Sequence, residues 1–121
     1  MADPLVLNSI AVQIASGQAL SAEVDIGGWT LVGIVVPSNW TTAGLSFQAS
    51  ADGGITWGEL QDQTATAIGV SSIAGGTQVF IAIDPTKLRG VRSLKVRSGT
   101  AAVPVNQTNT VTLQLLTRFV F

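Results

Sequence analysis

Residues 29–36 read Trp-Thr-Leu-Val-Gly-Ile-Val-Val, and Pro37 follows them. The run is almost continuously apolar and rich in β-branched residues, and its length suits a strand better than a helix. Such a run is typical of a central strand that is buried on both faces of its sheet. Because proline has no backbone N–H to donate, we expect the strand to end at Val36. The stretch therefore predicts the middle of a β-sheet.

The sequence on both sides of this run alternates between apolar and polar residues. Upstream, Leu20, Ala22, Val24 and Ile26 alternate with less apolar neighbours, and downstream the segments 45–50, 78–83, 93–97 and 111–119 have the same period of two. This period predicts strands with one face toward the core and one toward water. Weaker strand candidates lie at residues 5–15 and 64–70, which gives about eight strands.

Asp84 to Leu88 is the best candidate for a helical turn, with Asp84 as N-cap and Pro85 at the first helical position. No stretch favours a long helix. The sequence therefore predicts an all-β, single-domain antiparallel β-sandwich of the jelly-roll type over residues 1–121, with residues 1–8 as an extended N-terminal arm.

The composition narrows the classes of function. The chain has no Cys and no His, so it lacks thiolate metal ligands, disulfides and the commonest general base. We therefore expect no enzyme activity, no cofactor and no metal. No export signal or membrane-spanning run is visible. We therefore expect the chain to fold in a cytoplasm and to have no membrane as a partner. Charged residues make up 11% of the chain, against about 25% in ordinary domains, which favours self-association or a place in an assembly.

Residues 50–57 read Ser-Ala-Asp-Gly-Gly-Ile-Thr-Trp and resemble the Asp-box, a hairpin motif of sialidase-like propellers and other β proteins. Asp52 is expected to accept hydrogen bonds from backbone amides across the turn. Gly53 and Gly54 supply positive φ, and Trp57 is expected to pack over the hairpin. We interpret the motif as a structural turn, with ligand contact at its tip as the alternative.

Charges are segregated along the chain, because every Asp and Glu precedes residue 85 and every Lys and Arg follows it. The cluster of basic residues comprises Lys87, Arg89, Arg92, Lys95 and Arg97. It could contact a partner or a sister subunit, or it could pair with acids on neighbouring strands. The net charge of −1 and the lack of interleaved aromatics argue against nucleic acid. Lys95 and Arg97 share a strand face, and so do Glu23 and Asp25, and we expect both pairs to face solvent or a partner.

The aromatic residues raise two further hypotheses. Trp29 begins an apolar strand and is expected in the core, whereas Trp40 lies in the polar loop 37–42 and is the best candidate for an exposed aromatic. An exposed Trp40 would suit a sugar-stacking surface. The C-terminal residues Phe119 and Phe121 are apolar for a chain end, so we expect them to close the sandwich or to be buried by a neighbour.

Three segments in this order, residues 28–37, 45–57 and 83–100, resemble small virion proteins of tailed bacteriophages and related prophage-derived particles. The resemblance covers about residues 10–118. It implies a jelly-roll or similar sandwich, a homo-oligomer and no catalytic residues. It further implies a place on the capsid surface as a decoration, or cement, protein, with the major capsid protein or other virion proteins as partners.

The base of a head spike, a tail-fibre adaptor and a carbohydrate- or receptor-binding module are the alternatives. The expected contact regions are the basic stretch 87–97, residues 1–7 and residues 119–121.

Overall fold

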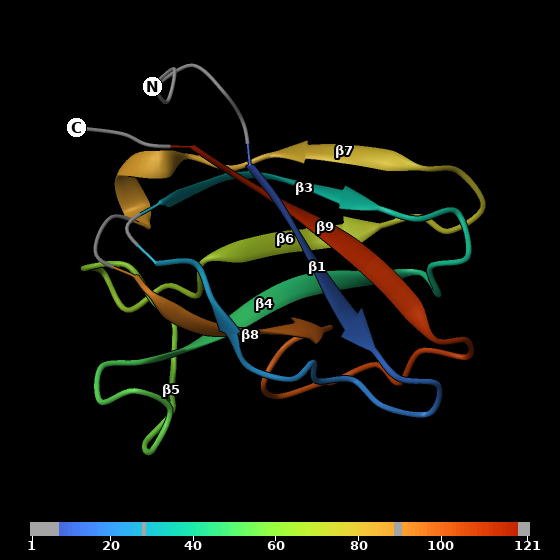
Figure 1. Ribbon diagram of the computed structural model, residues 1–121. Coiled ribbons are helices and arrows are strands. Elements are labelled where there is room, and N and C mark those ends of the chain that lie inside the picture. Colours follow the sequence, from blue (N-terminus) through green and yellow to red (C-terminus); the bar gives the residue numbers. More distant parts are fainter. Residues whose placement is uncertain (1–7, 28, 89–90, 119–121) are drawn as a thin grey trace.

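The structure is a computed structural model that describes residues 8–27, 29–88 and 91–118 (Figure 1). The expectations for the N-terminal arm, Arg89, Phe119 and Phe121 therefore lie outside the described residues, as does the side chain of Lys87. The described elements are β1 (Asn8–Ile14), β2 (Val24–Asp25), β3 (Thr30–Val36), β4 (Ala43–Ser50), β5 (Gly58–Glu59), β6 (Gly69–Ile73), β7 (Val79–Ala82), the 3-10 helix η1 (Pro85–Lys87), β8 (Ser93–Ser98) and β9 (Val111–Arg118).

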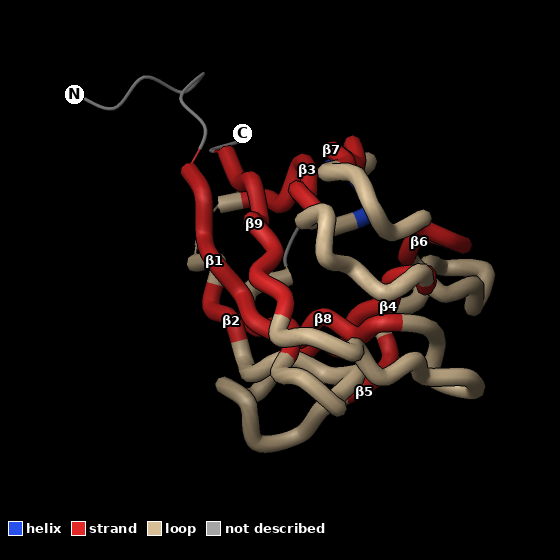
Figure 2. Tube along the Cα trace, turned by 90° about the vertical axis from the view of Figure 1, so that its right-hand side faces the viewer, coloured by secondary structure: helices blue, strands red, loops and turns tan. Residues whose placement is uncertain are grey.

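The strands form two antiparallel sheets that pack face to face, as Figure 2 shows. One sheet has the order β1-β9-β3-β7, and the other has the order β2-β8-β4-β5, with β6 also paired to β4. Without the two-residue β5, successive strands follow the order of a jelly roll, in which the chain passes repeatedly between the two sheets. The predicted all-β antiparallel sandwich is confirmed.

Strand β3 lies inside its sheet between β9 and β7, as the apolar run predicted. A bulge interrupts it, because Leu31 pairs with Thr117 while Gly33 pairs with the next residue, Leu116. The extra residue changes the phase of the strand, so that Leu31 and Ile34, three positions apart, are both fully buried. Val32 and Val35 are only half-buried, so the expectation of burial on both faces was wrong for these positions.

The core lies between the sheets and is built by the alternating residues that the sequence indicated. Each fully buried Leu, Ile or Phe contributes about 1.5–3 kcal/mol relative to exposure. The central residues of the core are Leu45 and Phe47 of β4, Leu94 and Val96 of β8, and Val111, Leu113 and Leu115 of β9.

Two predicted strands differ from the observed ones. In the segment 19–26 only Val24–Asp25 forms a strand, because the hydroxyl of Ser21 accepts the Val96 N–H at 2.9 Å and so replaces a backbone acceptor of the ladder. The strand predicted at 64–70 instead spans Gly69–Ile73, since Asp62 accepts the backbone N–H of Thr64 and turns the chain.

The predicted helical turn is present as the short helix η1. Asp84 Oδ1 accepts the backbone N–H of Thr86 at 3.0 Å, which satisfies one of the unpaired donors at the helix start. Within residues 8–27, 29–88 and 91–118, no helix has the length and apolar character to cross a membrane.

Candidate interaction surfaces

The turn at residues 50–57 is held by Asp52. Its Oδ1 accepts the backbone N–H groups of Ile55 at 3.2 Å and Thr56 at 2.8 Å, and also the hydroxyl of Ser50 at 2.8 Å. These hydrogen bonds, led by that from Thr56, lower the pKa of Asp52 to about 2. Gly53 and Gly54 adopt φ values of 74° and 96°. Because all three groups that donate to Oδ1 belong to the turn itself, the geometry supports a structural role.

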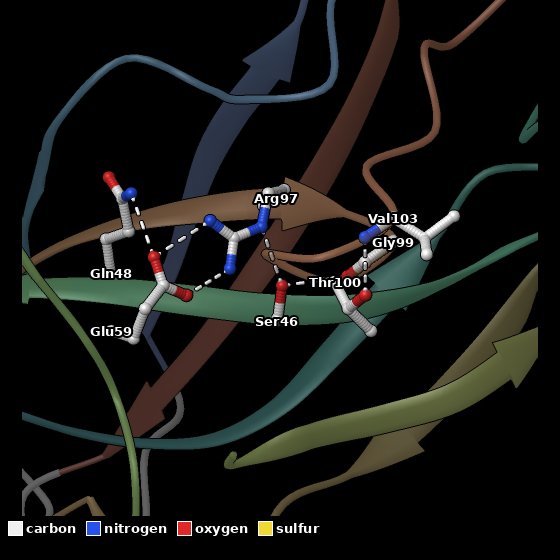
Figure 3. Close-up of polar contacts among 7 residues, drawn as sticks. All are labelled: Ser46, Gln48, Glu59, Arg97, Gly99, Thr100 and Val103. Atoms are coloured by element: carbon white, nitrogen blue, oxygen red, sulfur yellow. Dashed lines mark hydrogen bonds and ion pairs between the residues drawn. The ribbon is translucent and has the colours of Figure 1, made fainter.

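The neighbouring face of the five-stranded sheet carries an ion pair between Arg97 of β8 and Glu59 of β5. Arg97 Nη1 donates to Glu59 Oε2 at 3.0 Å, and its Nε donates to Ser46 Oγ at 3.0 Å, while Gln48 supplies a further donor to Glu59 (Figure 3). Hydrogen bonds from the guanidinium hold the pKa of Glu59 below its usual value. Arg97 is 7% exposed, so the expectation that it faces solvent or a partner was wrong.

Arg97 is buried because another strand covers the outer face of β8. Strand period placed Arg97 on the outer face of β8, as expected, but β5 folds back along β4 and brings Glu59 over that face. The aliphatic part of Arg97 is thereby covered while its head remains fully hydrogen-bonded. Glu59 belongs to this cluster, although its sequence neighbourhood gave no sign of a partner.

Two further residues of the basic stretch, Arg92 and Lys95, also have partners within the fold. Arg92 Nε lies 3.2 Å from Asp25 Oδ1, with both side chains largely exposed, and Lys95 Nζ lies 4.5 Å from the centroid of the Trp57 ring. Glu23 and Asp25 are exposed, in agreement with the prediction for that pair. Among the described basic residues of the stretch, pairing within the fold therefore accounts for Arg92 and Arg97.

Trp40 is buried, contrary to the expectation from its polar loop. It is 3% exposed, and its indole Nε1 donates to the carbonyl of Ala43 at 3.3 Å. The loop turns inward because the Trp40 N–H donates to the Pro37 carbonyl, which points the ring into the core. Trp29, which was expected in the core, is half-buried. Trp40 is thus no candidate for sugar stacking.

A polar residue that the sequence did not single out joins three loops at one end of the sandwich. Gln107 is fully buried, and its Oε1 accepts the Thr41 N–H at 2.7 Å. Its Nε2 donates to Ser98 Oγ at 2.7 Å and to the Thr41 carbonyl at 3.1 Å. Its backbone N–H donates to Gln18. Nothing in the local sequence distinguishes Gln107 from an exposed loop glutamine.

Large apolar side chains are exposed at separate places. Ile55 at the 50–57 turn is 84% exposed, Val103 in the β8–β9 loop is 67% exposed, and Phe80 of β7 is 62% exposed. Phe80 lies on the outer face of the four-stranded sheet, which the alternation of residues 78–83 implied. Isolated exposed apolar residues are normal, and Phe80 differs from the other two in lying on an edge strand.

Three surface depressions in the described part of the chain offer little to a sugar. One of about 610 Å³ lies between the β2 and β4 ends and is lined by Glu23, Asp25, Ser50, Ala51, Gly53, Arg92 and Ser93. Two others lie around Asp62. None of these three depressions has a Trp or Phe in its lining. Stacking of a sugar on an aromatic ring is therefore not available in them.

Together these features define a jelly-roll sandwich with structural polar clusters and dispersed exposed apolar residues. The fold is similar to that of the SPBc2 prophage-derived protein YomS in its crystal structure, with a TM-score of 0.50 and 12% sequence identity. The likeness covers 93% of this chain and 94% of the YomS chain, and it shows a shared fold. No protein-family model matches the sequence, and no curated protein sequence matches it significantly.

Proposed function

We propose that the protein is a non-enzymatic structural protein of a bacteriophage particle, and specifically a decoration, or cement, protein that binds and stabilises the head shell. The observation that carries the proposal is the likeness to a prophage-derived protein over 93% of the chain, together with the resemblance of three ordered segments to phage virion proteins. Its site on the particle is the capsid surface, and its partners are the major capsid protein or neighbouring virion proteins.

The surface suits attachment at several points. Ile55, Phe80 and Val103 project from a turn, an edge strand and a loop, so they are available to different neighbours. Burial of each would contribute about 1.5–3 kcal/mol, which is weak for one contact. Once one contact has formed, it raises the effective concentration of the remaining contact residues near their own binding sites. Strong overall attachment then follows without any single strong site.

Three of the described acids have partners within the fold, which supports a structural role over catalysis. Asp52 is engaged by backbone amides, and Glu59 and Asp25 are engaged by arginines. A carbohydrate- or receptor-binding module is less well supported, because Trp40 is buried and the depressions lack aromatic lining. The base of a head spike or a tail-fibre adaptor would use the same surface chemistry at one vertex.

The test is made on particles with and without the protein. Particles from a strain that lacks the gene are expected to release DNA at a lower temperature, and addition of purified protein is expected to restore resistance. Immunogold labelling separates a shell-wide cement from a component of one vertex. As a variant that preserves the fold, Ile55→Lys combined with Val103→Lys is expected to attach more weakly. Absence of the protein from purified particles would contradict the proposal.

A further inference from the structure

Strand β7 has an open edge. It is the last strand in the order β1-β9-β3-β7, and among the described residues no other strand pairs with it. The Ile83 N–H donates to the Val32 carbonyl at 3.0 Å. Since backbone groups of an antiparallel strand point alternately to either side, Ile81 and Val79 also bond toward β3. The N–H and C=O groups of Phe80 and Ala82 therefore point to the open edge.

The edge lacks three of the usual protections against pairing. Its sequence, Val-Phe-Ile-Ala, contains no charge and no proline, and the strand has no bulge in its pairing with β3. Gln78, just before the strand, is also uncharged and exposed. The strand is short, at four residues, which is one protection, but it carries none of the lysine, proline or bulge that natural edges also use, so it can accept another strand.

The side chain of Phe80 lies on the outer face of β7, with its ring turned toward β3. A Cβ at Gly33 would lie 3.2 Å from Cε1 and Cζ of the Phe80 ring, so the ring rests over the bare backbone of Gly33. Across the sheet, Phe80 pairs with Val35, and Val35 pairs with Gln114. This row is uncharged on the outer face, so a second apolar group could pack there without desolvating a charge.

We propose that β7 pairs antiparallel with β7 of a second copy of this chain, around a two-fold axis perpendicular to the sheet. The two four-stranded sheets then form one continuous sheet. Phe80 faces Phe80 of the second copy, and Gln78 faces Ala82 of the second copy. The inference is independent of where the protein resides on a particle.

Two separate conditions select this arrangement. The outer faces of the two copies lie on the same side of the joined sheet only when the facing residues are both even-numbered or both odd-numbered. The open edge offers the backbone groups of the even-numbered residues. Pairing of Phe80 with itself meets both conditions and uses the whole strand. It also places the two Phe80 residues directly opposite each other, and rotation of their rings from Gly33 toward the edge would form a cross-strand aromatic pair, which stabilises antiparallel strands. The strand is therefore complementary to its own copy.

The size of the contact sets its strength. Five residues of paired strand, from 78 to 82, extend over about 17 Å, which is short compared with interfaces that bury roughly 800 Å² per partner. We therefore expect a dimer that dissociates on dilution. Copies held close together by other contacts would pair far more completely.

Single cysteines test the register, because the chain has no cysteine of its own. Opposed residues of a hydrogen-bonded antiparallel pair have Cα atoms about 5.5 Å apart, within the range that a disulfide spans. Phe80→Cys is expected to form a covalent dimer under mild oxidation at least tenfold faster than Ile55→Cys or Val103→Cys. A mixture of Gln78→Cys and Ala82→Cys should cross-link, and each alone should do so much more slowly.

Sedimentation equilibrium of the unmodified chain provides the second measurement. The expected result is a monomer–dimer equilibrium that Phe80→Lys shifts at least tenfold toward monomer and that Ile55→Lys leaves unchanged. A monomer at all concentrations, with no preference of Phe80→Cys for cross-linking, would overturn the inference. A monomeric chain whose attachment to particles requires Phe80 would also overturn it, because the edge would then serve a shell protein.

Discussion

Arg97 and Glu59 form an ion pair that crosses β4 on the outer face of the five-stranded sheet, with Arg97 Nη1 3.0 Å from Glu59 Oε2. Side chains of the pair are 8% and 35% exposed respectively. Arg97 lies on the inner strand β8 and Glu59 on the two-residue strand β5, so the pair joins a short edge element to the middle of its sheet. It is more buried than the ion pair between Arg92 and Asp25.

Replacement of Glu59 by Gln is expected to lower the free energy of unfolding by about 1–3 kcal/mol. The change leaves the covered guanidinium of Arg97 without its charged partner, and the partial exposure of Glu59 keeps the loss below that of a fully buried pair. Urea denaturation measures the difference. Asp25→Asn, in the exposed pair with Arg92, is the matched control and should leave the midpoint almost unchanged. Equal effects of the two substitutions would contradict this account.

The alternation of residues 93–97 correctly separated the core side of β8 from its outer side. It could not show that Arg97 is buried, because period identifies a face and not the element that later covers it. The prediction that Trp40 is exposed was wrong for a related reason, since its polar neighbours lie at the surface while its own ring turns inward. Gln107 was missed because a buried glutamine is recognised by its partners, and these come from residues 41 and 98. Local patterns therefore predicted strands and turns, whereas contacts between distant segments required the fold.

Stability is expected to fall in acid, and Asp52 should account for part of the fall. Its pKa is lowered from 3.8 to about 2 in the folded chain, so its contribution is complete above about pH 4 and is lost as the pH falls toward 2. Glu59 acts in the same direction. Asp52→Asn should flatten the dependence of the unfolding free energy on pH between 2 and 4, as followed by urea denaturation at a series of pH values. An unchanged slope in this variant would assign the acid sensitivity to other carboxylates.

Gln107→Leu is expected to destabilise the protein by about 2–4 kcal/mol. The leucine is similar in size but leaves the Thr41 N–H without its acceptor and Ser98 Oγ without its donor in a buried place. The control is Gln13→Leu, because Gln13 is exposed and its amide donates only to Thr112 at 3.3 Å. Hydrogen exchange gives an independent measure, since the Thr41 amide should lose protection in Gln107→Leu before the central amides of β9 do. Retained protection at Thr41 would show that Gln107 does not hold this loop.

Trp40→Ala distinguishes a core residue from a sugar-binding one. Because Trp40 is 3% exposed, its truncation is expected to cost about 3–5 kcal/mol of stability, and any loss of glycan binding would follow from unfolding. Trp40→Phe retains most of the apolar contact and loses the hydrogen bond to the Ala43 carbonyl, so its loss should be much smaller. Fluorescence provides a check that does not depend on stability, since Trp40→Phe should remove the emission of shortest wavelength, whereas replacement of the half-buried Trp57 should remove redder emission. A stable Trp40→Ala variant that had lost glycan binding would restore the carbohydrate-binding alternative.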